Sequence, residues 1–384
     1  MKIMLFCWAE EMKTELLYWA VYLARLPQHF VITPLIRLGD EAKYKDAMSQ
    51  LSRISRNVSV NPVYLKSRDS RFRNLIFPNV LLSDSFSIFE AVNRSKPDVI
   101  VCFYVPHAYP LVLLKRILNF SLCVYAMGSD INIENDLLHR TVKKLIYDNC
   151  ALIFAYSEKM KRRIEEESGH RAIVIPSSAD SSVFRPLCSK TVLRRKWKVR
   201  TGTRIILTIS RLDKQKGVDV LIRSLKTLDR NDVCLWIRGN GPERNSLEKL
   251  ATSLGINERV RFLGFQDRKG LLELYNLADL FALTSYSEGL PRVVIEAMAC
   301  GCIPIVTNVG DVAAVVRDGF NGFIVSPGDH EKLGERIKQV LSLPEEARKI
   351  IQDRARVTVE NEFDSRRAIN EMVNSVNALA SERA

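Results

Sequence analysis

Short runs of β-branched and apolar residues alternate with helical patterns along the whole chain. This alternation constrains the fold more than any other feature. Continuous apolar runs are typical of strands that are buried on both faces of a sheet. Helical segments between such runs act as crossovers, so the strands should be parallel. The sequence therefore predicts an α/β protein with doubly wound parallel sheets, which bind ligands at the carboxyl ends of their strands.

The expected strands fall into two sets. The first set is Lys2–Cys7, Phe30–Ile36, Asp98–Tyr104, Leu122–Ala126, Leu152–Ala155 and Ala172–Ile175. The second set is Arg204–Ser210, Val233–Arg238, Val260–Phe262, Leu280–Leu283, Ile303–Thr307 and Gly322–Val325. Two sets in 384 residues indicate two domains. We expect a domain over residues 1–188 and a second over 189–364, with the ligand in the cleft between them.

Helical patterns separate the expected strands. In the first half they cover Glu11–Leu26, Glu134–Asn149 and Glu158–Ser168. In the second half they cover Val218–Leu228, Glu243–Leu254, Arg268–Leu277, Pro291–Cys300 and His330–Leu341. A last helix is expected at Ser365–Ala380, and periodicity alone does not assign it to either domain.

The positive charge is concentrated in one part of the chain. The net charge is +13, of which residues 1–187 carry +6 and the short segment 188–200 carries +6. Such asymmetry fits contact with a polyanion or an anionic membrane surface, and it also fits a solvated face of a soluble protein. Nucleic acid is the weaker interpretation, because the sequence has no zinc-finger spacing, RNP-like string or basic heptad array.

Metal binding and membrane spans are not expected. The eight cysteines lie mostly in apolar runs without a C-x-x-C pair, which is typical of reduced core thiols in a cytosolic protein. Cys300 and Cys302 have no second Cys/His pair nearby, so no metal site is predicted. The N-terminus does not resemble a signal peptide. The longest apolar stretch, Val99–Leu114, is interrupted by two prolines, so any membrane contact should be peripheral.

Two acidic residues stand at the start of one expected helix. Glu288 and Gly289 follow the strand Leu280–Leu283, Pro291 opens the helix, and Glu296 lies farther along it. Unpaired N–H groups at a helix start suit a phosphate, and carboxylates accept paired hydrogen bonds from vicinal hydroxyls. The two acids should therefore have different roles. The alternative is ordinary helix-end chemistry, because acids are favoured there without any ligand.

Two further loops join a strand to a helix. Arg211 and Lys216 lie in the loop after the strand Arg204–Ser210, and together they can hold a diphosphate and neutralise it as a leaving group without Mg²⁺. The alternative is a solvated basic loop. The string Arg238-Gly239-Asn240-Gly241-Pro242 lacks the third glycine of the dinucleotide fingerprint, and alone it indicates only a turn.

Together these motifs resemble the large retaining family four of nucleotide-sugar glycosyltransferases, which has the GT-B fold. The resemblance is close over roughly residues 170–360 and loose in the first half. It rests on Ser210-Arg211-Leu212, Lys216-Gly217, Gly239-Asn240-Gly241-Pro242, Val260, Leu263-Gly264-Phe265, Glu288 and Glu296 with seven residues between them, Ala297-Met-Ala-Cys-Gly301-Cys-Ile-Pro304, Asp318-Gly319, Asn321-Gly322 and Pro327-Gly328-Asp329.

The resemblance implies a role for each motif of the second half. Arg211 and Lys216 would hold the donor diphosphate, helped by backbone N–H groups of Gly289 and Leu290. Glu288 would contact the transferred sugar, and Glu296 the ribose hydroxyls. The nucleobase would lie near Gly241, Phe265 and Gln266. The C-terminal helix, residues 365–384, would pack back on the N-terminal domain, and the nucleotide-sugar would be a co-substrate with no cofactor or metal.

The family retains the anomeric configuration. A double displacement would need a carboxylate nucleophile, and no candidate stands out. The resemblance favours a front-face route in which the leaving phosphate takes the acceptor proton.

The first half departs from the family pattern. No glycine loop follows the first strand, Met127 stands where many relatives have histidine, and Ala313-Ala314 stand where a glutamate is usual. His107 follows the strand Asp98–Tyr104 and would supply an acid/base group or a sugar contact. The alternative for His107 is a loop histidine bonded to backbone. Asp130 is either an acceptor contact or a loop cap.

These observations lead to one functional hypothesis. The chain is expected to be a cytoplasmic retaining glycosyltransferase with peripheral contact to the membrane. It would move a hexose from a nucleotide diphosphate, with UDP as the expected nucleotide, to a saccharide hydroxyl. The acceptor would be a lipid-linked glycan, and nucleic acid is not an expected partner. Basic residues of the first half and the segment Lys190–Arg200 would dock on anionic lipid. Those of the first half include Lys43, Lys45, Arg53, Arg56, Lys66, Arg68, Arg71 and Arg73. Alternatives are a sugar-nucleotide epimerase or phosphorylase, or a non-catalytic GT-B scaffold.

Overall fold

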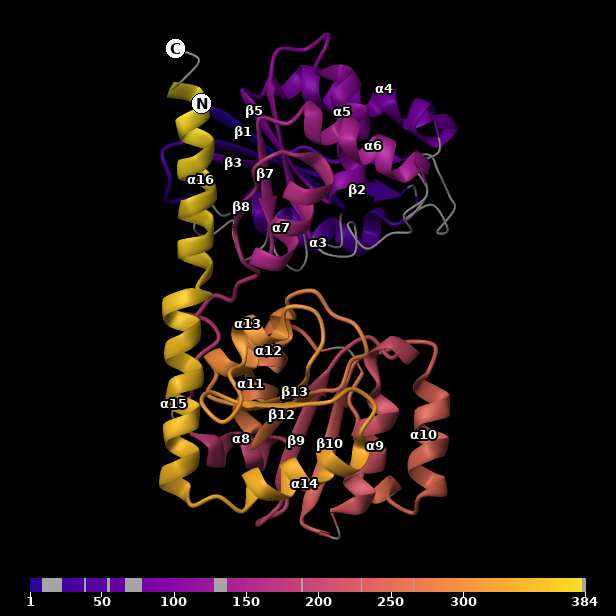
Figure 1. Cartoon of the computed structure of the whole chain (residues 1–384), viewed down its shortest axis with the longest axis vertical. Coiled ribbons are helices and arrows are strands. Elements are labelled where there is room, and N and C mark those ends of the chain that lie inside the picture. Colours follow the sequence, from indigo (N-terminus) through magenta and orange to yellow (C-terminus); the bar gives the residue numbers. More distant parts are fainter. Residues whose placement is uncertain are drawn as a thin grey trace. The chain divides into compact units, whose positions relative to one another are not determined.

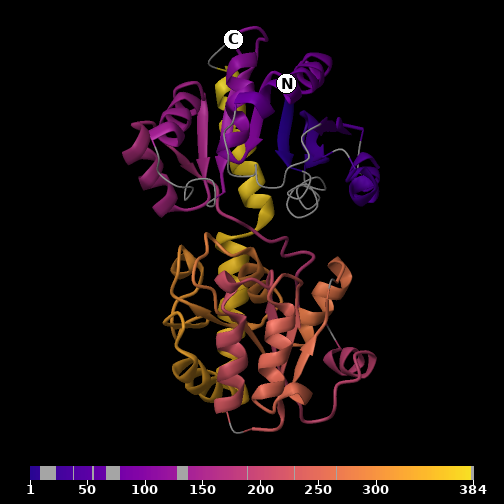
Figure 2. The same cartoon turned by 90° about the vertical axis from the view of Figure 1, so that its right-hand side faces the viewer.

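The chain divides into two compact units, each built around a parallel sheet in this computed structural model. The first unit comprises Met1–Pro176 with Ser365–Ala384, and the second comprises Ser177–Asp364. Helices cover both faces of each sheet (Figures 1 and 2), as expected for continuous apolar strands. The structure describes residues 1–8, 23–37, 39–53, 56–65, 78–127, 137–187, 189–228, 230–264 and 266–381.

The first unit holds an eight-stranded parallel sheet. Its strands are β1 (Lys2–Trp8), β2 (His29–Arg37), β3 (Val58–Val60), β4 (Val63–Leu65), β5 (Val99–Phe103), β6 (Ser121–Ala126), β7 (Leu152–Ala155) and β8 (Ile173–Val174). Their order is β3-β2-β1-β5-β6-β7-β8, and β4 also pairs with β2. Its helical segments are α3 (Glu41–Ser52), α4 (Pro78–Ser95), η3 (Val105–Ala108), α5 (Tyr109–Leu114), α6 (Leu137–Asp148), α7 (Glu158–Ser168) and α16 (Ser365–Ser381).

The second unit holds a six-stranded parallel sheet. Its strands are β9 (Arg204–Ile209), β10 (Val233–Arg238), β11 (Val260–Phe262), β12 (Leu280–Leu283), β13 (Ile303–Thr307) and β14 (Phe323–Val325), in the order β11-β10-β9-β12-β13-β14. Its helical segments are α8 (Lys190–Lys196), η4 (Lys214–Lys216), α9 (Val218–Thr227), α10 (Arg244–Ser253), η5 (Asn257–Arg259), α11 (Arg268–Leu277), α12 (Arg292–Ala299), α13 (Val312–Val315), α14 (His330–Leu341) and α15 (Glu345–Glu362).

Each sheet reverses its strand order beside its first strand. In the second unit the chain runs from β9 outward to β10 and β11, and then returns to place β12 on the other side of β9. The first unit does the same, with β1 flanked by β2 and β5. The crevice outside the carboxyl ends of two such strands is where open α/β sheets bind ligands. The loops that follow β9 and β12, and those that follow β1 and β5, are therefore the expected ligand-binding loops.

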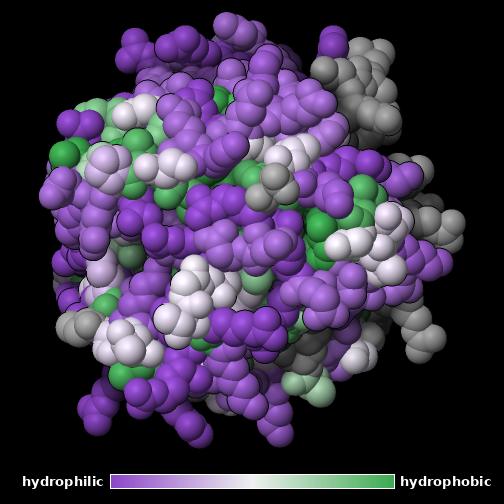
Figure 3. Space-filling model, turned by 90° about the horizontal axis from the view of Figure 1, so that it is seen from below, coloured by the Kyte–Doolittle hydropathy of each residue, from purple (hydrophilic) through white to green (hydrophobic). Residues whose placement is uncertain are grey.

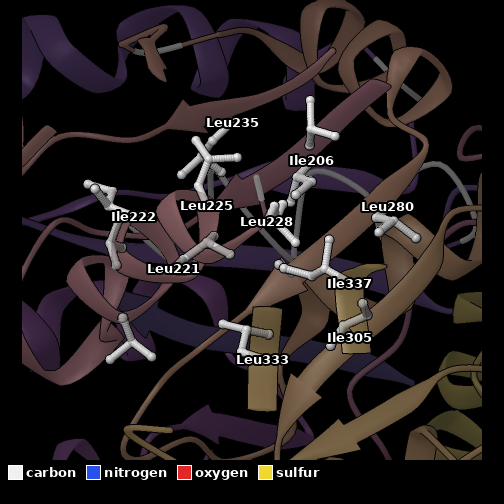
Figure 4. Packing of buried hydrophobic residues seen from close by; sticks show 14 of the residues in the cluster. Ile206, Leu221, Ile222, Leu225, Leu228, Leu235, Leu280, Ile305, Leu333 and Ile337 are labelled. Carbon is white, nitrogen blue, oxygen red and sulfur yellow. The ribbon is translucent and has the colours of Figure 1, made fainter. Parts of the chain in front are cut away.

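The core of the second unit lies between its sheet and the helices α9 and α14. Figure 4 shows aliphatic side chains of these helices against the strands. Burying one such side chain stabilises a fold by about 1.5–3 kcal/mol, so this cluster anchors the ends of the strands that carry the loops. The labelled members are Ile206, Leu221, Ile222, Leu225, Leu228, Leu235, Leu280, Ile305, Leu333 and Ile337.

The division between the units falls between Pro176 and Ser177, earlier than the expected division between residues 188 and 189. The reason is visible in the contacts of the intervening loop. Leu187 N donates to Asn276 Oδ1 of α11 at 2.7 Å, and the Phe184 ring lies 5.9 Å from the Tyr275 ring. These contacts attach the loop to the second unit.

Part of the charge of the basic segment 188–200 is paired within the second unit. Lys190 Nζ lies 3.1 Å from Asp279 Oδ1, and Lys196 Nζ lies 2.7 Å from both carboxylate oxygens of Glu273. Arg194 donates to two nearby carbonyl oxygens at 3.0 and 2.7 Å. Half of the basic side chains of this segment therefore fasten it to the second unit. Four further basic residues proposed for docking, Lys66, Arg68, Arg71 and Arg73, lie outside the described residues.

The surface of the molecule is largely hydrophilic on the face drawn in Figure 3. Apolar side chains appear there as small separate patches. Among the described helices, none combines the length and the hydropathy needed to cross a membrane.

The tie between Glu273 and the basic segment gives a testable prediction. Burial raises the pKa of Glu273, but the hydrogen bonds from Lys196 and Trp197 lower it by more. The net result is a pKa below the usual value of 4.5. A lowered pKa means that the pair stabilises the fold above pH 4.5 and that this contribution is lost as the pH falls below 4.5. Glu273→Gln should therefore cost about 2 kcal/mol of unfolding free energy at pH 7. Urea denaturation should show a smaller difference in unfolding free energy between wild type and Glu273→Gln at pH 4 than at pH 7. An equal difference at the two pH values would contradict the ion pair between Glu273 and Lys196.

Candidate active site

The loops after β9 and β12 meet at the switch point of the second sheet. Tyr286 N donates to Gln215 O at 2.8 Å, and Thr284 Oγ1 donates to Gly217 O at 2.8 Å. The approach is close enough to require glycine at residue 217. Its φ is +56°, and an added Cβ would lie 2.3 Å from Thr284 O. These bonds hold the two loops in one arrangement.

Lys216 and Glu288 form an ion pair between these two loops. Lys216 Nζ lies 2.8 Å from Glu288 Oε1, and the side chains are 23% and 12% exposed. Ser285 Oγ donates to the same carboxylate oxygen at 2.6 Å. The pair is thus largely shielded from water but still accessible from outside. A diphosphate that binds Lys216 would compete with Glu288 for the ammonium group.

Arg211 is paired with a carboxylate inside its own loop. Its Nε lies 2.5 Å from Asp213 Oδ2. The Arg211 side chain is 67% exposed, whereas that of Asp213 is only 15% exposed. Each cation expected to hold a diphosphate therefore has an acidic partner in this structure.

The chain after Glu288 supplies backbone donors. The amides of Gly289 and Leu290 donate to no other residue in the described part of the chain. Pro291 caps α12 with an extended backbone, so these amides stand just before the helix. Amides of this kind near a helix N-terminus favour an anion. The structure thus brings two cations and two free donors to one switch point.

Glu296 lies on α12 and is 5% exposed. Tyr275 OH donates to its Oε2 at 2.9 Å, and Arg292 Nε lies 3.2 Å from its Oε1. Burial raises the pKa of Glu296, although the Arg292 charge and the Tyr275 hydroxyl act in the opposite direction. A carboxylate held from two sides in this way is well oriented to accept hydrogen bonds from vicinal hydroxyls.

The expected nucleobase loop packs against the loop that carries Arg211. Leu212 N donates to Asn240 O at 3.0 Å. An added Cβ at Gly241 would lie 2.2 Å from Leu212 O, so this position requires glycine. Gln266 Nε2 donates to Leu263 O at 3.1 Å, and Gln266 O accepts from Arg238. Phe265 lies outside the described residues.

His107 belongs to the first unit. It lies in η3, directly after β5, at the switch point of the first sheet. Its Nδ1 lies 3.2 Å from Phe103 O, and its ring stacks at 4.6 Å on the ring of Tyr104. Tyr104 has φ +78°, a conformation that is rare for a bulky residue and often marks a functional site. The backbone contact is the one expected of a loop histidine. Asp130 lies outside the described residues.

The partners of the charged residues were not found from the sequence. Asp213 stands two residues from Arg211, and Ser285 three residues before Glu288, so their spacing carried a usable signal. No signal in the sequence identified Tyr275 as a partner of Glu296, because Tyr275 lies on another helix, α11. Among the described residues, no group of three or more His, Cys, Asp or Glu side chains is arranged to hold a metal ion.

Gly310 offers a test of how tightly the Glu288 loop is packed. Its φ is +58°, and an added Cβ would lie 2.0 Å from Glu288 O. Asp311 N also donates to Gly289 O at 3.1 Å. Gly310→Ala should therefore displace the loop and lower the melting temperature by several degrees, since a forced clash costs about 1–3 kcal/mol.

Gly319 provides the matched control, because its φ is +72° and nothing lies within 4 Å of an added Cβ. Gly319→Ala should lower the melting temperature only by the strain of its backbone conformation. Equal melting temperatures for the two variants would show that the Glu288 loop is not packed as described.

Comparison with known proteins identifies the second unit. Residues 189–357 match the family model of glycosyl transferases group 1. An uncharacterized glycosyltransferase of Methanocaldococcus jannaschii is 36% identical, and the match covers 40% of each chain. A lipopolysaccharide core biosynthesis glycosyltransferase of Rhizobium meliloti is 28% identical, over 80% of this chain and 82% of that protein.

The fold is similar to that of a solved Anabaena protein, HepE, in complex with UDP-glucose. The TM-score is 0.79 at 20% identity, covering 98% of this chain and 100% of that chain. This match and the two sheets confirm the expected fold class, two Rossmann-like units of the GT-B type. Residues 189–357 therefore match the glycosyl transferases group 1 family, and the two units together have the GT-B fold.

Proposed function

We propose that the protein is a retaining glycosyltransferase that moves a sugar from a nucleotide diphosphate, with UDP as the favoured nucleotide, to a saccharide hydroxyl. The observation that carries the proposal is the Lys216–Glu288 pair at the switch point, beside the free amides of Gly289 and Leu290. A cation, two backbone donors and a carboxylate match the charges of a diphosphate that is linked to a sugar.

Charge neutralisation explains how these residues would assist the reaction. When the bond between the sugar and the phosphate breaks, negative charge develops on the leaving diphosphate. Lys216 and Arg211 would stabilise this charge, and the amides of Gly289 and Leu290 would share it. The Glu288 carboxylate, once Lys216 turns to the diphosphate, would accept hydrogen bonds from sugar hydroxyls.

The remaining proposed contacts concern the nucleoside and the acceptor. Glu296, held by Tyr275, would accept hydrogen bonds from the ribose hydroxyls. The loop around Gly241 and Gln266 would contact the base. His107, at the switch point of the first sheet, would contact the acceptor or the sugar. The relatives support a glycan acceptor carried by lipid, since one is named for lipopolysaccharide core biosynthesis, and the bound UDP-glucose of the Anabaena protein supports the UDP-sugar.

A thermal-shift panel of UDP-, GDP- and ADP-sugars tests the donor class. At a ligand concentration one hundred times Kd, binding to the folded protein adds about 2.7 kcal/mol, which gives a shift of several degrees. We expect the melting temperature to rise most with the UDP-sugars. No shift with any of the three would exclude the proposed function and leave a non-catalytic scaffold.

Glu288→Ala tests the role of the carboxylate. It should lower kcat for sugar transfer at least a hundredfold, as expected when a group at the reacting centre is removed. Nucleotide binding should persist, because Lys216 is released from its partner. Asp353→Ala is the control, since it removes an exposed carboxylate that lies 2.7 Å from Lys349 on α15. Unchanged turnover in Glu288→Ala would refute the assignment, and conversion of the UDP-sugar without an acceptor would indicate an epimerase.

A further inference from the structure

We propose that Asp213 is a positioning residue for the donor: it holds Arg211 by Nε so that both Nη groups stay available for the diphosphate. This inference rests on the proposed function, because it concerns the same donor site. Asp213 is not among the motif residues named above, and its proposed role is to orient Arg211.

The contact between the two residues uses one edge of the guanidinium. Arg211 Nε lies 2.5 Å from Asp213 Oδ2, and neither Nη atom of Arg211 has a partner in the described part of the chain. A guanidinium binds a phosphate bidentately through two neighbouring N–H groups. With Nε occupied by Asp213, the edge between Nη1 and Nη2 remains for two phosphate oxygens.

The Asp213 carboxylate depends on Arg211 for compensation of its charge. Its side chain is 15% exposed, and its buried Oδ1 has no hydrogen-bond partner among the described residues. Arg211 is therefore the main compensation for a carboxylate that is largely removed from water. Glu288 keeps its hydrogen bond from Ser285 when Lys216 turns to the diphosphate, whereas Asp213 has no second donor among the described residues. Separating a shielded carboxylate from its one cation is costly, so Arg211 should stay with Asp213 when a ligand arrives.

The backbone of the loop fixes the position of this pair. Leu212, between the two residues, donates from its N to Asn240 O at 3.0 Å. Asp213 O accepts from Lys216 N at 3.1 Å. The carboxylate that orients Arg211 is thus built into the same turn that carries Lys216, the other cation proposed for the diphosphate.

Positioning and simple electrostatics predict opposite results when Asp213 is removed. As an anion near the proposed diphosphate site, Asp213 repels the ligand, so its removal should tighten binding if charge alone decides. If Asp213 instead presents Arg211, its removal should weaken binding, because a flexible exposed arginine must be ordered by the ligand. The sign of the change in affinity therefore separates the two explanations.

The experiment is calorimetric titration of UDP, GDP and ADP into the full chain, followed by donor kinetics with the sugar of the nucleotide that binds. The variants are Asp213→Ala, Asp213→Asn, Arg211→Lys and the double variant Arg211→Lys with Asp213→Ala. Asp232→Ala is the matched control. Asp232 pairs with Arg230 at 2.9 and 2.7 Å with the same spacing in sequence, but it precedes the amino end of β10, away from the switch point.

Asp213→Ala should weaken nucleotide binding about tenfold and lower kcat/KM by at least as much, because Arg211 contributes both to donor binding and to stabilising the leaving diphosphate. Asp213→Asn should retain part of the affinity, because its amide oxygen can still accept from Nε. The double variant should bind no more weakly than Arg211→Lys alone, since both changes remove one interaction. Asp232→Ala should bind as wild type does.

Several results would overturn the inference. One is binding by Asp213→Ala that is equal to or tighter than wild type, and another is an additive loss in the double variant. If Asp213→Ala fails to fold, Asp213→Asn decides, and wild-type affinity in that variant counts against positioning. Failure of the wild type to bind any of the three nucleotides would overturn the proposed function itself.

Discussion

The ion pair between Lys216 and Glu288 joins two loops that come from strands separated by more than seventy residues of sequence. It forms because the sheet places β9 and β12 side by side, so the loops that follow them emerge at the same edge. The close approach of Gly217 to Thr284 brings the backbones into contact, and the charges then meet across that contact. The rest of the site is arranged around this junction.

The neighbouring loops are attached to the same junction by backbone contacts. The Gly239–Gly241 turn packs on the Arg211 loop, and the residues after β13 pack on the Glu288 loop through Gly310. Glycine is required at these points because another backbone occupies the space of a Cβ. The apolar core between the strands and the helices α9 and α14 lies beneath these contacts. It holds the loops after β9, β10, β12 and β13 in fixed positions relative to one another. Backbone packing therefore sets the positions of these loops, and the loops in turn position the charged side chains before any ligand binds.

The strands of the second unit could be predicted from the sequence almost residue by residue, whereas its helices α8, α13 and α15 were not predicted. The expected strands Val233–Arg238, Val260–Phe262 and Leu280–Leu283 coincide with β10, β11 and β12. Continuous apolar runs flanked by glycine-containing turns make such strands easy to recognise. The first unit was predicted less fully. The short strands β3 and β4 and the helices α3 and α4 were not predicted, because three-residue strands leave no clear period and the helices carry mixed composition.

The charged contacts show a second limit of sequence-based prediction. The cations Arg211 and Lys216 and the acids Glu288 and Glu296 were identified as candidates, but their partners were not. Tyr275 reaches Glu296 from another helix, and only the packing of α11 on α12 brings them together. The acidic partners of the basic segment before β9, Glu273 and Asp279, were not predicted, because they lie some eighty residues away in sequence. Pairing over such distances depends on the tertiary structure, which local pattern does not contain.

The central claim is that Lys216 exchanges Glu288 for a nucleoside diphosphate. Titration of UDP, GDP and ADP into the wild type and into Lys216→Met, at low and at high salt, tests it most directly. The account predicts one binding site for at least one of these nucleotides, with an affinity that falls with salt and is at least about tenfold weaker in Lys216→Met, where a charge-assisted contact is lost. Equal affinity in the two proteins, or no binding by the wild type, would contradict it.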